Sequence, residues 1–103
     1  MTSSLFDAAE AERRKIVGKA LAADHRIELL TAARGFAAFI AAQQGTVNSD
    51  EVAAIMAENG LDYTELGNAA GSVFDEKFVW TGEVVPSRRP ASHGRLIRVW
   101  RRA

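Results

Sequence analysis

The segment of the chain that most clearly suggests chemistry is PSRRPASHGR, residues 86–95. It holds both prolines of the chain, three arginines and one of the two histidines, and it contains no acidic residue. Arginine offers a planar fork of N–H donors that fits phosphate oxygens, and proline limits the conformations of the loop. Arg88, Arg89 and Arg95 are therefore candidate phosphate ligands, and His93 could add a contact. The alternative is a solvated loop whose charges maintain solubility.

Two strands are expected to position this loop. The flanking segments KFVWTGEVV and LIRVWR are rich in β-branched and aromatic residues, which favours strands. The loop then forms the tip of a β-hairpin, and its prolines, which cannot donate to a strand ladder, lie where pairing ends. Gly82 indicates a bulge or a twist in the first strand, and residues 46–47 could supply a short third strand.

The second strand is expected to have two different faces. If Ile97 and Val99 face inward, Arg98 and Trp100 share the other face, where they could contact a partner. We expect Trp100 to belong to the core instead, packed against another aromatic residue of the hairpin.

Two short helices are expected before the hairpin. Asn48 and Glu51 have the spacing of a capping box, and the helix that they begin ends at Asn59–Gly60. Asp62, again with a glutamate three residues later, begins a second helix through residues 62–74. Two short helices joined by a turn of about three residues are typical of a helix-turn-helix.

The helix predicted over residues 62–74 has an apolar and a polar side. Its apolar residues should face the core: Leu66, Ala70, Val73 and Phe74. Its polar side, at i, i+4 spacing, consists of Thr64, Asn68 and Ser72. Gly67 and Gly71 permit close approach, either of a partner surface or, as we prefer, of another part of this chain.

The first 44 residues are alanine-rich and free of proline, which predicts helix. Ser4 and Asp7 resemble a capping box. We expect a break near Gly18 or around Ala22–Asp24, where Asp24 could cap a second segment, because one helix of this length would exceed the domain. The core-facing stripe of the later segment is Leu29, Ala33, Phe36 and Ile40. Gly45 is expected to end that helix in the left-handed conformation.

Composition bounds the class of protein. With 103 residues, 48% hydrophobic and 25% charged, the chain is expected to form one globular domain. It has no cysteine, and its longest apolar run, GFAAFIAA, is too short to span a bilayer. We find no signal-peptide pattern and expect a cytoplasmic location without membrane attachment.

Charge is distributed unevenly although the net charge is zero. Residues 46–75 hold six acids and no base, whereas residues 76–103 hold seven bases and two acids. This split predicts a surface with two unlike faces.

The order of helix, short strand, helix, turn, helix and hairpin resembles the winged helix-turn-helix family. The resemblance covers roughly residues 24–103, with TVNSDEVAAIMAENGLDYTELGNAAGSVF as the helix-turn-helix and FVWTGEVVPSRRPASHGRLIRVW as the wing. The ending HGRLIRVWR also looks like that of small winged-helix proteins encoded by bacteriophages and prophages. The resemblance implies an α+β fold with a three-helix core and a C-terminal hairpin, preceded by an N-terminal helical extension, residues 1–23.

The resemblance also implies binding to double-stranded DNA. The wing residues Arg88, Arg89, His93 and Arg95 would contact the DNA backbone or minor groove. Residues 62–74 would be the recognition helix, with Thr64, Asn68 and Ser72 reading bases and Asn68 pairing with an adenine edge. That helix has no lysine or arginine, which departs from the family's common pattern and argues against major-groove reading, because phosphate contacts normally dominate affinity.

Two functional hypotheses follow. The first is a DNA-binding regulatory or DNA-processing accessory protein of a phage or prophage. The second is a protein-interaction module, an adaptor or inhibitor of a host protein, whose acidic and basic surfaces each meet a complementary one. The N-terminal helix either pairs with a second subunit, giving a homodimer, or folds back on its own domain.

An enzyme is not expected. His25 and His93 lie in separate elements, and the sequence contains no paired-carboxylate, metal-ligand or phosphate-cradling glycine pattern. We therefore expect no catalytic residue, no cofactor and no metal.

Overall fold

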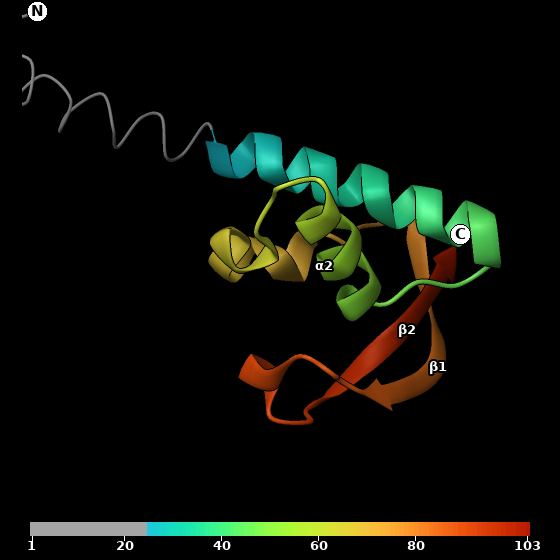
Figure 1. The fold of residues 1–103 in the computed structure, drawn as a ribbon. Helices are drawn as coiled ribbons and strands as arrows, with labels where there is room; N and C mark the ends of the chain where they lie inside the picture. The colour runs from blue at the N-terminus through green and yellow to red at the C-terminus, as the bar shows by residue number, and fades with distance from the viewer. Residues whose placement is uncertain (1–24) are drawn as a thin grey trace, which may run out of the picture.

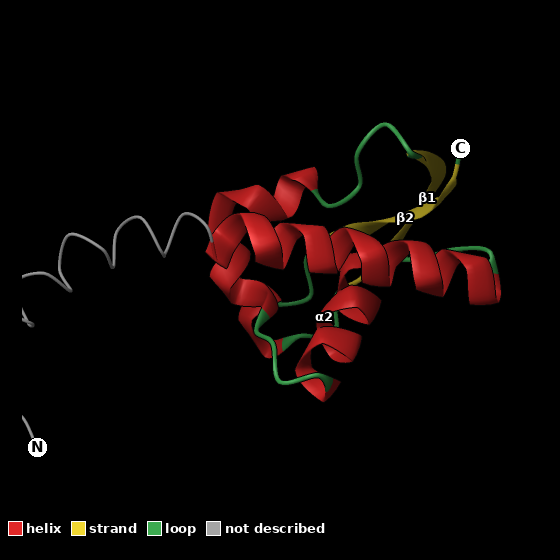
Figure 2. Ribbon diagram, turned by 90° about the horizontal axis from the view of Figure 1, so that it is seen from above, coloured by secondary structure: helices red, strands yellow, loops and turns green. Residues whose placement is uncertain are grey.

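The computed structural model describes residues 25–103, which form three helices and a two-stranded antiparallel sheet. A helix runs through residues 25–44 and is followed by α2 (Ser49–Glu58), the 3-10 helix η1 (Tyr63–Ser72), β1 (Phe78–Pro86), the short 3-10 turn η2 (Pro90–Ser92) and β2 (Leu96–Arg102). The long first helix lies above the other elements in Figure 1. In Figure 2, which is seen from above, α2 extends to one side of this helix and the two strands lie on the other. The predicted α+β class is confirmed.

The predictions made for the N-terminal extension, residues 1–23, fall outside the described residues. They include the cap at Ser4 and Asp7, the helix break near Gly18 or Asp24, and the homodimer contact through this segment.

The first helix buries one narrow stripe against the rest of the domain. Its buried residues recur every four positions: Leu29, Ala33, Ala37 and Ala41, all at most 5% exposed. Phe36 and Ile40, which the sequence placed in the stripe, are half-buried beside it. Gly45 ends the helix as predicted, with φ of 89° and its N–H donating to the Ala41 carbonyl at 2.8 Å.

Both ends of α2 confirm the sequence predictions. The Asn48 side chain accepts from the Glu51 N–H, and the Glu51 carboxylate accepts from the Asn48 N–H, each at 2.9 Å. At the other end Gly60 has φ of 74° and the Leu61 N–H reaches the Met56 carbonyl at 2.9 Å, the Schellman arrangement.

Replacing Asn48 by alanine is expected to lower the free energy of unfolding by about 1 kcal/mol, because the first turn of α2 loses its cap. Urea denaturation measures the loss. Asn48→Ser is the matched control, since serine caps about as well as asparagine and should retain most of the stability. Equal stability of the alanine and serine variants would contradict this role.

The prediction of one continuous helix over residues 62–74 is wrong. The segment is a 3-10 helix interrupted at Gly67, whose φ of 55° and ψ of −129° are not helical. A methyl group at Gly67 or Gly71 would have no neighbour within 4 Å, so neither glycine serves close packing, and Gly67 serves the kink instead. The apolar side was predicted correctly: Leu66 and Val73 are fully buried, and Ala70 and Phe74 are half-buried.

The two predicted strands form an antiparallel hairpin whose register runs from Phe78 opposite Arg102 to Pro86 opposite Leu96. The register shifts between Trp80 and Val84, around Gly82, which confirms the bulge. Val47 forms an isolated bridge with Trp100, so the predicted third strand exists as a single residue pair. Ile97 and Val99 are buried, and Trp100 stacks on Phe74 with ring centroids 5.2 Å apart, rather than on an aromatic residue of the hairpin.

None of the helices within residues 25–103 has the length and apolar character needed to cross a membrane.

Candidate nucleic-acid interface

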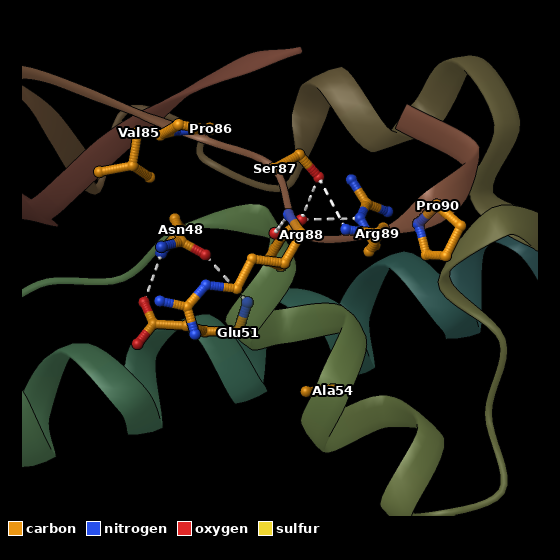
Figure 3. Close-up of a pocket in the computed structure, with 10 residues that line it drawn as sticks. Asn48, Glu51, Ala54, Val85, Pro86, Ser87, Arg88, Arg89 and Pro90 are labelled. Carbon is orange, nitrogen blue, oxygen red and sulfur yellow. Dashed lines mark hydrogen bonds and ion pairs between the residues drawn. The ribbon is translucent and has the colours of Figure 1, made fainter. Parts of the chain in front are cut away.

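The tip of the hairpin, residues 87–95, is held against the first turn of α2 by one carboxylate. Asp50 Oδ1 accepts from the Ser87 hydroxyl at 2.7 Å and from Arg89 Nε at 2.8 Å, while Oδ2 accepts from the Arg88 backbone N–H at 2.6 Å. The Asp50 side chain is 17% exposed and Ser87 is 6% exposed. Figure 3 shows Ser87, Arg88 and Arg89 reaching the helix beside Asn48 and Glu51. Three donors from the tip thus share a largely buried acceptor.

Arg89 joins three elements of the structure. Besides its ion pair with Asp50, its guanidinium carbon lies 4.9 Å from the ring centroid of Tyr63, the first residue of η1. The sequence suggested loop arginines without a nearby acid, whereas in the structure Arg89 is paired with Asp50. The physical reason is that Asp50 and Arg89, 39 residues apart in sequence, are brought together when the hairpin packs on α2.

Burial and hydrogen bonding have opposite effects on the pKa of Asp50. Burial raises the pKa of the carboxyl, whereas the hydrogen bonds from the Arg88 N–H, Ser87 and Arg89, together with the Arg89 charge, lower it more, leaving it below the ordinary 3.8. Asp50 is therefore ionised near neutral pH, and its contacts persist until the medium is strongly acidic.

The loop beyond Ser87 is closed by its own backbone. The Ser87 N–H donates to the Arg95 carbonyl at 2.8 Å, and the Arg95 N–H donates to the Ser92 carbonyl at 2.9 Å. His93 and Gly94 turn the chain with positive φ values of 48° and 74°. This closure fixes the path of the loop and leaves Arg88, His93 and Arg95 exposed.

Two tip arginines keep their charge available to solvent. Among residues 25–103, neither Arg88 nor Arg95 has a guanidinium nitrogen within 4.0 Å of a carboxylate oxygen. The Arg88 side chain extends on the Glu51 side of an open cavity of about 870 Å³ between the tip and the start of α2 (Figure 3). The tip therefore presents two exposed guanidinium groups on a backbone anchored at Asp50.

The polar residues predicted on η1 are not arranged on one helical face. The Thr64 hydroxyl donates to its own cap, Asp62, at 2.6 Å, and the Gly67 kink separates Thr64 from Asn68. Asn68 and Ser72 are exposed. Glu65, expected to complete a capping box with Asp62, instead lies 2.8 Å from His25 Nε2. The kink therefore removes the regular i, i+4 spacing on which base reading was predicted.

Sequence reasoning missed three residues that shape this region. Asp50 is an ordinary first-turn acid of α2, Tyr63 follows a cap residue, and no local pattern connects either of them with the tip. Arg34 also escaped notice: its Nε donates to the Ser72 carbonyl at 3.0 Å and lies 3.6 Å from an Asp75 oxygen. These contacts hold the end of η1 on the first helix.

Three comparisons, with family models, curated proteins and solved structures, found no match to this chain. The side chains described for residues 25–103 also contain no cluster of three histidine, aspartate or glutamate residues that could hold a metal ion.

Proposed function

We propose that the chain is a winged-helix protein that binds double-stranded DNA, with the hairpin as the wing. The observation that supports this most is the pair of exposed guanidinium groups, Arg88 and Arg95, on a tip anchored to α2 by Asp50. Arg88 and Arg95 contact phosphate oxygens, and His93 between them adds a hydrogen bond. In this proposal the protein acts in the regulation or the processing of DNA.

Anchoring of the tip favours this role for an energetic reason. A mobile loop would lose conformational entropy when it bound the DNA backbone, which would subtract from the affinity. Here the hydrogen bonds to Asp50 and the closed loop have already ordered the backbone. In this proposal Arg89 stabilises the wing, and Arg88 and Arg95 contact the DNA.

The helical segment η1 has a minor role in this proposal. It carries Glu65 and no lysine or arginine, and its kink prevents a straight recognition helix. Asn68 and Ser72 are exposed near it and add at most modest base contacts. Binding is therefore expected to depend weakly on DNA sequence and strongly on salt.

A mobility-shift titration against random-sequence duplex DNA at low salt tests the proposal. We expect retardation, with log affinity falling against log salt at a slope of about −2 to −4, since each neutralised phosphate contributes roughly −0.9. Absence of retardation at low salt would contradict DNA binding and would favour the protein-interaction hypothesis instead.

A further inference from the structure

One face of the hairpin carries an exposed apolar strip beside the core. Opposing residues of an antiparallel pair share a face, and the register pairs Trp80 with Trp100 and Val84 with Arg98. Alternation along β2 then places Leu96 on the same face as Arg98. We call Trp80, Val84, Leu96 and Arg98 the docking strip; its three apolar residues are 42%, 43% and 62% exposed.

The strip is ordered by its own contacts. The Arg98 guanidinium carbon lies 4.5 Å from the ring centroid of Trp80, and the Trp80 indole N–H donates to the Glu83 carbonyl at 2.9 Å. The opposite face of β2 is occupied differently, because Ile97 and Val99 are buried. Val79, which pairs with Arg101 on that opposite face, is 37% exposed, so most but not all of the exposed apolar side chains of the hairpin lie on the face of the strip.

Charge decides what can cover the strip. Arg98 lies within it, and Arg102 lies further along the same face, over the ring of Phe78. The acid of β1, Glu83, is in the bulge, outside the regular alternation. Two copies meeting strip to strip would bring these cations together, which disfavours self-association. A partner with carboxylates is favoured.

We propose that the docking strip binds an acidic, amphipathic segment of another protein. Apolar side chains of the partner cover Trp80, Val84 and Leu96, and its carboxylates meet Arg98. Tryptophan and arginine are the residue types that most often dominate the energy of protein interfaces. The docking strip shares no residue with the tip, although Leu96 directly follows Arg95, and this inference does not depend on the proposed DNA binding.

Single-stranded nucleic acid is the less favoured occupant. Platforms for unpaired bases usually offer successive exposed aromatic rings. Here the ring opposite Trp80, that of Trp100, is stacked on Phe74, and the Arg98 guanidinium already lies over the Trp80 ring. The other exposed apolar residues of the strip, Val84 and Leu96, are aliphatic and suit protein side chains better.

Selection from a displayed library of random peptides on the full-length chain tests the inference. We expect enrichment of peptides that combine Asp or Glu with Leu, Phe or Trp. A synthetic enriched peptide should bind the Leu96→Asp variant at least about tenfold more weakly, because the substitution places a charge in the apolar strip. Ile27→Asp is the matched control, since Ile27 is 65% exposed on the first helix and should leave binding unchanged.

Thermal melts of both variants establish that each is folded. Enriched peptides without acidic residues would overturn the inference, as would equal binding to the parent and the Leu96→Asp variant. Two further results would overturn the inference. One is binding of a single-stranded oligothymidine that the Leu96→Asp substitution weakens. The other is self-association, measured by sedimentation, that Leu96→Asp abolishes.

Discussion

Replacing Asp50 by alanine is expected to lower the free energy of unfolding by about 2–4 kcal/mol. Three donors lose their shared acceptor: the buried Ser87 hydroxyl, the Arg88 N–H and the Arg89 guanidinium. Removing one partner of a largely buried pair costs more than the pair contributes, because the remaining groups stay desolvated. Urea denaturation followed by circular dichroism measures the change.

Glu58→Ala is the matched control for this substitution. Glu58 is an exposed acid at the other end of α2, so its removal should change stability by no more than about 0.5 kcal/mol. If the two substitutions changed the stability equally, Asp50 would affect stability only through the net charge of the protein, which would contradict the anchoring role.

The contribution of Asp50 should also depend on pH. Its folded-state pKa is below the ordinary 3.8, so the ionised carboxylate stabilises the fold above that pH, and this stabilisation is lost as pH falls through the lowered pKa. The stability difference between the parent and Asp50→Asn should therefore be large at neutral pH and should shrink in strong acid. If this stability difference stayed constant from neutral to strongly acidic pH, the ionised Asp50 carboxylate would not be the stabilising group.

The double substitution Arg88→Ala, Arg95→Ala is expected to weaken binding to duplex DNA by roughly tenfold to a hundredfold at moderate salt. Both side chains are exposed, so the fold should persist while two phosphate contacts are lost. The slope of log affinity against log salt should flatten by about 2, and the loss should be similar for all DNA sequences. Fluorescence anisotropy over a series of salt concentrations measures both quantities.

The matched control for this variant is Arg26→Ala, Lys77→Ala. It changes the net charge equally, and both residues are exposed outside the tip. We expect a much smaller loss of affinity. Equal losses in the two double variants would mean that binding reflects overall charge rather than the tip.

Local sequence patterns predicted the parts of the fold that are determined locally. The capping box of Asn48 and Glu51, the left-handed glycines at helix ends and the bulge at Gly82 each follow from residues a few positions apart. The two strands and their turn could likewise be read from β-branched residues and prolines. For the tip, sequence identified the cationic loop but did not distinguish Arg89, which is paired, from the exposed Arg88 and Arg95.

Contacts between distant segments could not be predicted in this way. The pairing of Asp50 with Arg89 depends on how the hairpin packs on α2, and no spacing in the sequence encodes it. The kink in η1 was also missed, because a glycine inside a helical pattern is compatible with both a continuous and a broken helix. These two features change the expected site most, since one removes Arg89 from the free cations and the other disrupts the predicted recognition helix.

The most direct test of the account is an NMR titration of the labelled protein with duplex DNA, followed through its backbone amide signals. We expect the largest shifts at residues 88–95, an Arg88 amide that stays hydrogen-bonded to Asp50, and little change in η1. Shifts confined to η1 or to the first helix, with the tip unaffected, would contradict it.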